Sequence, residues 1–169
     1  MRKLILLRHG KSSWSDSSLP DVDRPLAPRG ERAARVIAEY MRLNSVRPAL
    51  VLCSPSLRTR QTLQAIEPSL GSSCSIDLVD ELYAASQEEL LELVRTAPES
   101  ADSVLLIGHN PGLQDLALAL ATRGAELPRL REKFPTAALA TIGVGRDSWA
   151  ALEPGDGVLL DFVVPRQLA

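Results

Sequence analysis

The sequence predicts an α/β fold, a three-layer α/β/α sandwich around a mainly parallel central sheet. Short apolar segments alternate along the chain with amphipathic segments of about 10–15 residues, as strands alternate with crossover helices. The length of 169 residues, with 45% apolar and 24% charged residues, is typical of a soluble globular domain. We therefore expect a single domain over residues 1–169.

The first part of the chain is expected to form two strands, a long loop and a helix. Leu4–Leu7 is a short apolar run, typical of a buried strand. Lys11–Ala27 is rich in Ser, Asp and Pro without periodicity, and a loop of this length is usually functional. Apolar residues at helical spacing then predict a helix from Pro28 to about Asn44. Ala49–Cys53 is the second expected strand.

The middle of the chain carries two signals for helix starts. Ser54 and Pro55 favour a helix with Ser54 as N-cap and Pro55 in the first helical position. Ile76–Val79 follows as a third short strand. Ser86 and Glu89 have the spacing of a capping box, which predicts the start of the next helix.

The last part of the chain is expected to contain three strands and one helix. Ser103–Ile107 is the fourth strand. Asn110 is expected to cap a helix over Pro111–Leu120. Ala137–Val144 and Val158–Val164 are the two final strands, separated by a turn-rich segment.

Composition and charge exclude several classes of partner. Nineteen basic and 21 acidic residues give a net charge of −2, which does not favour binding to nucleic acid or to an anionic membrane surface. The longest apolar runs, such as Leu116–Ala121, are far too short to span a membrane. Because no export signal is recognisable, we expect a cytoplasmic protein whose two cysteines, Cys53 and Cys74, are reduced thiols.

Histidine and arginine side chains follow the apolar strands at the expected ligand-binding edge. The chain contains two histidines, His9 and His109, and each comes directly after a predicted strand and beside a glycine. Ligands bind at the carboxyl ends of strands in open α/β sheets. Arg8 precedes His9, and Arg58 lies early in the helix after the second strand. Two guanidinium groups near a helix N-terminus predict an anion site that suits a phosphoryl group.

A metal site does not fit this pattern. Zinc needs three or four ligands, and the sequence has neither H-x-x-H nor H-E-x-x-H. Arg8 and Arg58 would also repel a cation bound beside the histidines. The sequence lacks a Walker-type phosphate loop, a G-x-S-x-G elbow and a G-x-G-x-x-G fingerprint. We therefore expect neither a metal nor another cofactor.

These residues resemble the histidine phosphatase superfamily, and in finer pattern its SixA-type phosphohistidine phosphatase branch. The resemblance extends from residue 4 to about residue 142. Three motifs carry it in order: Arg8-His9-Gly10, Ser54-Pro55-x-x-Arg58-x-x-x-Thr62 and Gly108-His109-Asn110-Pro111. Further segments that match are Leu7–Trp14, Asp23-Arg24-Pro25-Leu26, Pro28-Arg29-Gly30, Leu82-Tyr83 and Phe134–Leu139.

The resemblance implies a phosphoglycerate-mutase-like fold and a covalent mechanism. His9 would be the nucleophile and would form a phosphohistidine intermediate that water hydrolyses. Arg8, Arg58 and His109, the last either protonated or donating as a neutral ring, would hold the phosphoryl oxygens. The superfamily places an acidic proton donor after the third strand, where Glu81 is our candidate and Asp80 the alternative. A phosphohistidine substrate has little need of such an acid if its leaving ring already carries a proton.

Segment lengths bear on the substrate. Between Arg58 and His109 the chain is fully used by helix, strand, helix and strand, which leaves no inserted lid. An uncovered site admits a phosphohistidine-containing protein, but it also admits a small phosphoester. The alternatives to a phosphohistidine phosphatase are therefore a small-molecule phosphomonoester phosphatase and, from another class, a non-catalytic phosphoryl-binding module. The sequence does not predict the oligomeric state.

Overall fold

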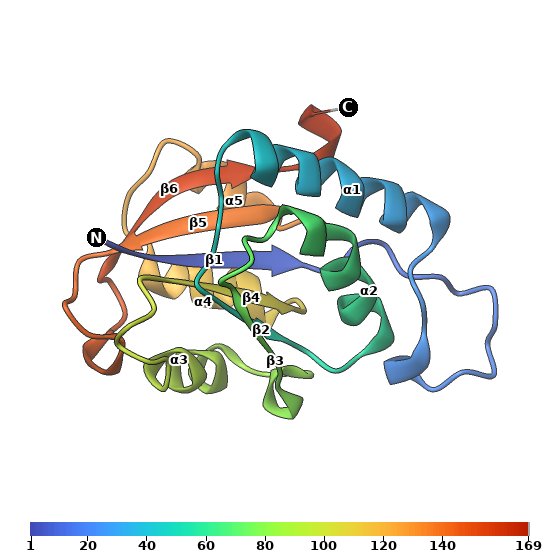
Figure 1. Ribbon diagram of the computed structural model, residues 1–169, viewed down its shortest axis with the longest axis horizontal. Coiled ribbons are helices and arrows are strands. Elements are labelled where there is room, and N and C mark those ends of the chain that lie inside the picture. The colour runs from blue at the N-terminus through green and yellow to red at the C-terminus, as the bar shows by residue number, and fades with distance from the viewer. Residues whose placement is uncertain (169) are drawn as a thin grey trace.

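The computed structural model describes residues 1–168, which form one six-stranded sheet with helices on both faces (Figure 1). The strands are β1 (Arg2–Arg8), β2 (Leu50–Cys53), β3 (Ser75–Leu78), β4 (Ser103–Gly108), β5 (Leu139–Val144) and β6 (Gly157–Val163). The helices are α1 (Pro28–Leu43), α2 (Leu57–Ile66), α3 (Gln87–Arg95), α4 (Gly112–Leu120) and α5 (Leu127–Glu132). Short 3₁₀ turns include η1 (Asp21–Asp23) and η3 (Asp80–Leu82).

The sheet confirms the predicted α/β class and is mixed but mostly parallel. Its strand order is β3-β2-β4-β1-β5-β6, with parallel pairing from β3 to β1. β5 pairs antiparallel with both β1 and β6, so it alone runs against the other strands of the described chain. The 145–156 connection between β5 and β6 contains only a single 3₁₀ turn, and a connection without a crossover helix leads to an antiparallel neighbour.

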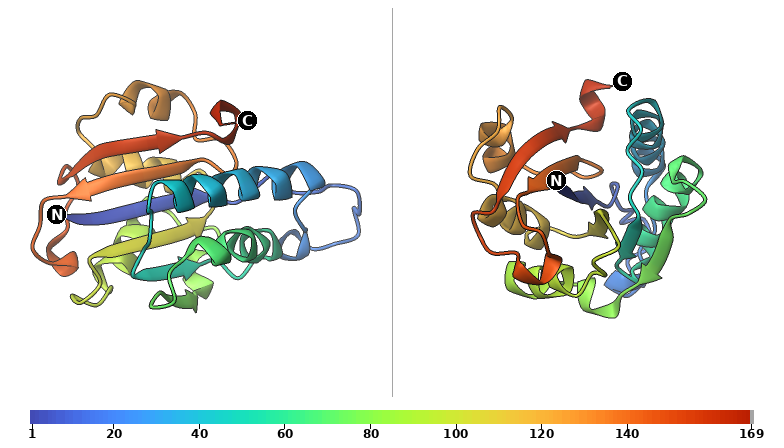
Figure 2. Two further views of the ribbon diagram at one scale, coloured as in Figure 1. Left: turned by 45° about the horizontal axis from the view of Figure 1, so that its top comes forward. Right: turned by 60° about the vertical axis from the view of Figure 1, so that its left-hand side comes forward.

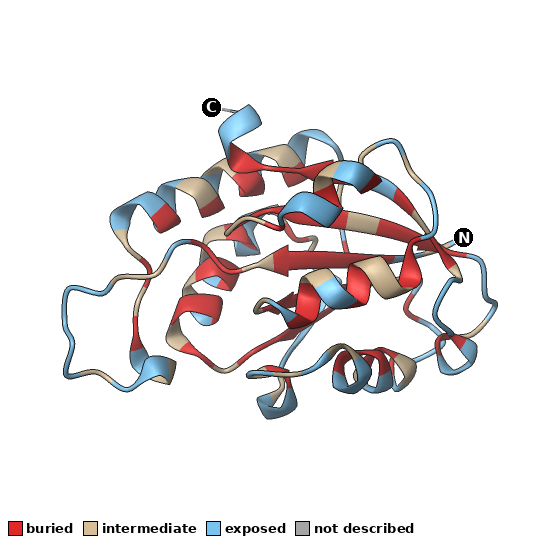
Figure 3. Ribbon diagram, turned by 180° about the vertical axis from the view of Figure 1, so that it is seen from behind, coloured by how far each residue is buried: buried red, intermediate tan, exposed pale blue. Residues whose placement is uncertain are grey.

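Two layers of helices bury the two faces of the sheet. Figure 2 shows α1 and α2 on one face and α3, α4 and α5 on the other. Alternate side chains of β1 reach the two sides: Leu4 and Leu6 join one apolar cluster, whereas Ile5 and Leu7 join the other. The central strands are therefore buried on both faces, as Figure 3 shows.

The starts of two helices differ from the prediction. Helix α2 begins at Leu57, and its N-cap is Ser56, whose hydroxyl accepts from the Thr59 N–H. Ser54 and Pro55 therefore precede the helix. Both serines beside Pro55 are good N-cap residues, and a long-range contact of the Ser54 hydroxyl, described below, decides between them.

Helix α4 begins at Gly112, with Pro111 rather than Asn110 in the N-cap position. The Asn110 side chain still accepts from the Gln114 N–H at 3.3 Å, so it caps this helix from one residue further out. Helix α5 was not predicted, because six residues are too few to show a helical period. The capping box of Ser86 and Glu89 is confirmed, with both reciprocal hydrogen bonds present.

Within residues 1–168, no helix has both the length and the apolar character needed to cross a bilayer. The chain between Arg58 and His109 contains α2, β3, α3 and β4, joined by short connections. The expectation of no inserted lid in this segment is therefore confirmed.

Candidate active site

The fold brings the two histidines together at the carboxyl edge of the sheet. His9 directly follows β1 and His109 directly follows β4, which are adjacent parallel strands in which Arg8 lies opposite Gly108. The centroids of the two imidazole rings are 5.3 Å apart. The two histidines therefore line one site.

The backbone determines which nitrogen of His9 is free. Its Nδ1 lies 2.6 Å from the carbonyl oxygen of Gly10. A carbonyl can only accept, so the neutral ring carries its proton on Nδ1 and keeps the lone pair of Nε2 available. The side chain is buried. His9 is thus held in the tautomer that a nucleophilic imidazole needs.

Burial keeps both rings uncharged. Burial is the largest cause that lowers the pKa of His9 to about 3, against the hydrogen bond to the Gly10 carbonyl, which raises it; the positive charges of Arg58 and Arg8 act in the same direction as burial. The pKa of His109 is lowered to about 4, again first by burial and then by Arg58. The arginines expected to keep His9 neutral therefore contribute, but burial is the larger cause. Of the two forms considered for His109, the neutral donating ring is favoured.

Two arginines face the histidines with unused donors. Arg8 donates from Nη1 to the carbonyl of Phe134 at 2.9 Å, and Arg58 donates from Nη1 to the carbonyl of Asp21 at 2.7 Å. The Nε atoms of both arginines are buried, and neither has a hydrogen-bond partner within residues 1–168. A buried N–H without a partner is costly, and an anion bound between the arginines would satisfy both.

The threonine of the second motif, Thr62, connects Arg58 to the turn that follows His9. The Thr62 hydroxyl accepts from the N–H of Gly10 at 3.1 Å and donates to the carbonyl of Arg58 at 2.8 Å. A Cβ atom at Gly10 would come within 2.7 Å of the carbonyl oxygen of Gly30 in α1. This close approach explains why glycine follows His9.

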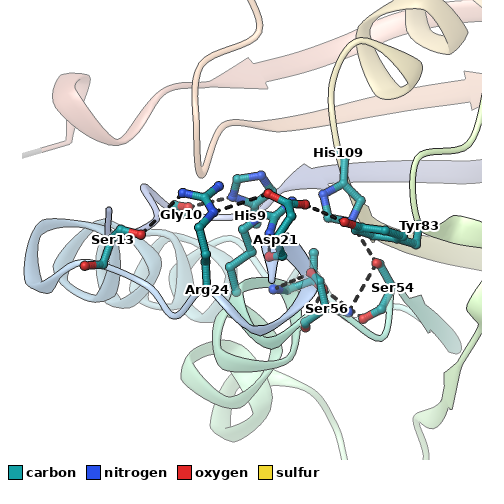
Figure 4. Close-up of polar contacts among 11 residues, drawn as sticks. His9, Gly10, Ser13, Asp21, Arg24, Ser54, Ser56, Tyr83 and His109 are labelled. Carbon is teal, nitrogen blue, oxygen red and sulfur yellow. Dashed lines mark hydrogen bonds and ion pairs between the residues drawn. The ribbon is translucent and has the colours of Figure 1, made fainter. Parts of the chain in front are cut away.

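The long loop over residues 11–27, expected to be functional, supplies Asp21 and Arg24 to the site. The Asp21 carboxylate accepts from Arg58 Nη2 at 3.0 Å, from Arg24 Nε at 3.2 Å and from the Tyr83 hydroxyl (Figure 4). The Arg24 guanidinium also stacks on the exposed ring of Trp14 at 3.4 Å from its centroid. The sequence contained a signal for two of these residues, because Arg24 and Tyr83 lie within motifs that match the superfamily. A motif match does not show, however, which groups these side chains contact.

Asp21 places a negative charge on the arginine side of the site. The hydrogen bond from Tyr83, followed by those from Arg58 and Arg24, lowers the pKa of its carboxyl group to about 2 against the opposing effect of burial. Asp21 is therefore ionised at neutral pH. Asp21 takes the Nη2 donor of Arg58, so the Nε, which has no partner within residues 1–168, is the donor of this arginine that remains for a phosphoryl group.

Glu81 is not joined to this cluster. It lies on η3 and is exposed, and within residues 1–168 no hydrogen bond or ion pair connects it to His9, Arg8, Arg58 or His109. Asp80, the alternative, is exposed on the same turn. In the described part of the chain, no three His, Cys, Asp or Glu side chains are grouped as metal ligands would be.

A cavity of about 400 Å³ adjoins His109. Its walls come from the segment that leads into α3 and from the start of α4. The lining residues are Ala84, Ala85, Ser86, Gln87, Glu88, His109, Asn110, Pro111, Gly112 and Asp115. Apart from the histidine, the titratable side chains among them are the two acids, Glu88 and Asp115.

Comparisons with known proteins agree with this geometry. The family model for the histidine phosphatase superfamily (branch 1) matches residues 4–83. A Mycobacterium tuberculosis H37Rv protein is 37% identical over 164 residues, which cover 95% of this chain and 100% of that protein.

Two solved structures extend the likeness over almost the whole chain. A candidate phosphohistidine phosphatase SixA from Agrobacterium tumefaciens superposes with a TM-score of 0.82 at 32% identity, over 97% of this chain and 98% of the other. The protein histidine phosphatase SixA complexed with tungstate superposes with a TM-score of 0.75 at 26% identity, over 99% of each chain.

A mostly parallel sheet that presents two histidines and two arginines with buried Nε donors at its carboxyl edge defines a phosphatase of the phosphoglycerate-mutase-like fold. The chain belongs to the histidine phosphatase superfamily, and within it to the SixA-type branch.

The shifted histidines predict how stability depends on pH. Both rings have a pKa near 6.5 in the unfolded chain and a lower one in the folded protein. Below pH 6.5 the unfolded state therefore binds more protons, and the free energy of unfolding falls as the pH is lowered. The loss is up to about 1.4 kcal/mol per histidine for each pH unit.

Urea denaturation between pH 7 and pH 5 measures this effect above the range where carboxyl groups titrate. His9 and His109 are the only histidines of the chain, so the His9→Asn/His109→Asn double variant should lose most of the slope. An equal slope in the double variant would contradict the assignment.

Proposed function

We propose that the protein dephosphorylates phosphohistidine on other proteins, without a metal, through a phosphohistidine intermediate at His9. One observation carries the proposal: a buried neutral imidazole with a free Nε2 lies near two arginines whose Nε donors have no partner within residues 1–168. The tungstate complex of the related SixA protein supports it, because tungstate is a tetrahedral oxyanion like phosphate.

In the first step, the Nε2 lone pair of His9 attacks phosphorus in line with the leaving group. The bond between phosphorus and the substrate's imidazole nitrogen breaks, and its electron pair stays on that ring. If the other nitrogen of the ring already carries a proton, the ring leaves as a neutral imidazole. Arg8, Arg58 and a donating His109 hold the equatorial oxygens, where charge stabilisation and positioning supply most of the catalysis.

In the second step, water attacks the phosphorylated His9. The N–H at Nδ1 of His9 remains bound to the Gly10 carbonyl, so His9 also leaves phosphorus as a neutral imidazole. Phosphate and a proton are released, and the free enzyme is restored. The two steps are chemically alike, since each expels an imidazole whose other nitrogen is protonated.

The cavity beside His109 supports a phosphohistidine substrate over an anionic metabolite. Glu88 and Asp115 line it, and no lysine or arginine does within the described chain. A small phosphoester that carries a carboxylate or a second phosphate would meet two acids there and no cation. The leaving imidazole of a phosphohistidine side chain is neutral and meets no such repulsion. The chain between Arg58 and His109 has no inserted lid that would hinder the approach of a protein substrate.

The proposal is tested by comparing kcat/KM for a phosphohistidine protein, an aryl phosphate and a carboxylate-bearing phosphoester, all in EDTA. We expect turnover of the first two, with the phosphohistidine protein preferred. A preference for the anionic ester would favour the small-molecule phosphatase. Binding without phosphate release would indicate a phosphoryl-binding module, and activity lost in EDTA and restored by a divalent ion would contradict the metal-free mechanism.

Glu81 is proposed as proton donor only for substrates with strongly basic leaving groups. Glu81→Gln should slow hydrolysis of an alkyl phosphate by about 10²–10⁴-fold, the usual scale for general acid catalysis. Its effect on a nitrophenyl phosphate and on a phosphohistidine peptide should be much smaller.

The three rates are compared in Glu81→Gln and in Asp80→Asn. Equal losses on all three substrates would assign Glu81 to binding or structure. A leaving-group dependence in Asp80→Asn alone would move the role to Asp80, and no loss in either variant would exclude an acid on η3.

A further inference from the structure

The hydroxyl of Ser54 contacts the second histidine. Ser54 directly follows β2, which is adjacent to β4, and its side chain is fully buried. Its Oγ lies 2.7 Å from Nε2 of His109, as Figure 4 shows. Since Ser56 caps α2, the hydroxyl of Ser54 is not needed for that helix.

The neighbouring contacts indicate which group donates in this hydrogen bond. The N–H of Ser56 points to the Ser54 Oγ at 3.5 Å, so the oxygen already serves as an acceptor. Within residues 1–168, the hydroxyl hydrogen has no acceptor other than Nε2 of His109. Donation from Ser54 to Nε2 therefore gives the hydroxyl hydrogen an acceptor, whereas the reverse direction leaves a buried O–H unpaired.

We propose that Ser54 is a positioning residue that holds neutral His109 in the tautomer with its proton on Nδ1. In that tautomer the ring nitrogen that Ser54 does not bind carries a hydrogen and can donate to a phosphoryl oxygen. In the opposite tautomer, a lone pair would face the anion and repel it. This inference rests on the proposed function, because only a role of His109 in phosphoryl binding makes its tautomer matter.

The tautomer itself is read by ¹⁵N-detected NMR of the imidazole rings at neutral pH, where no substrate is needed. With two histidines in the chain, the His109→Asn variant assigns the signals. His9 is the internal standard, because the Gly10 carbonyl holds its proton on Nδ1. We expect His109 to be protonated on Nδ1 in the wild type and to lose this preference in Ser54→Ala. Protonation on Nε2 in the wild type would overturn the proposal.

Kinetics and stability provide the second arm, with Ser56→Ala as matched control. Ser56 is equally buried and two residues away, but its hydroxyl caps α2 and does not contact His109. Ser54→Ala should lower kcat on an aryl phosphate by about 10–100-fold, the scale for removing a partner that orients an imidazole. Ser56→Ala should mainly lower the thermal unfolding midpoint and leave kcat nearly unchanged.

The outcomes separate this proposal from the function on which it rests. An unchanged tautomer and unchanged kcat in Ser54→Ala would overturn the role of Ser54 while the phosphatase stands. A wild-type protein with no phosphatase activity would overturn the proposed function, whereas the NMR spectra would still decide the tautomer.

Discussion

His9→Ala is expected to lose phosphatase activity by about 10⁴-fold or more, the scale for removing a covalent nucleophile. Rapid quenching of the wild type with labelled substrate should trap one phosphoryl group on His9. The adduct should be labile in acid and stable in alkali, as expected for a phosphorus–nitrogen bond. The physical reason is that Nε2 of His9 has the free lone pair of a buried, uncharged ring.

The second histidine supplies the control for this experiment. His109→Asn should turn over slowly but still become labelled, because it retains His9. Label on a serine or cysteine, label that persists in His9→Ala, or full activity of His9→Ala would contradict the mechanism.

Arg58→Ala is expected to lower kcat by about 10²–10³-fold or more, the scale for losing a preorganised charge-stabilising donor. Arg8→Ala should have a similar effect. Arg58 is buried, and its Nε has no partner in the described part of the chain, so its removal takes away a positive charge that solvent does not replace. Arg58→Lys should restore little activity, because one ammonium group cannot reproduce the planar fork of a guanidinium. Vanadate inhibition should weaken in parallel.

Arg60 is the matched control for Arg58. It lies two residues further along α2 and is exposed, where it donates to the carbonyl of Pro55. Arg60→Ala should therefore keep near wild-type kcat and vanadate affinity. Equal losses in both variants would point to a general effect of charge or of helix stability rather than to an anion site, and circular dichroism would show whether the variants are folded.

The carboxyl-edge site was predictable because strand ends can be read locally. A buried strand is a short apolar run, and parallel neighbours place their carboxyl ends together. His9 and His109 were expected at that edge, and the structure places their rings 5.3 Å apart. Arg8 and Arg58 were expected beside them, and their charges act on both rings.

The contacts of the loop residues were not predictable, because they join positions far apart in the sequence. Asp21 reaches Arg58 over 37 positions and Tyr83 over 62. A loop without periodicity does not reveal which of its acids turns inward. The sequence likewise did not predict that Glu81 is exposed, because local patterns do not indicate in which direction the turn after β3 points its side chains.

The sequence by itself determined the alternation of strands and helices, the strand ends and the residue types gathered there, because these follow from local periodicity and turn chemistry. Only the tertiary structure decided the direction of β5 and the uses of the two serines beside Pro55. Ser54 and Ser56 are equally good N-caps as sequence, but β2 lies next to β4, so the Ser54 hydroxyl meets His109 and Ser56 is left to cap α2. The N-cap of α2 therefore depends on a hydrogen bond between Ser54 and a residue 55 positions further along the chain, and not on local propensity.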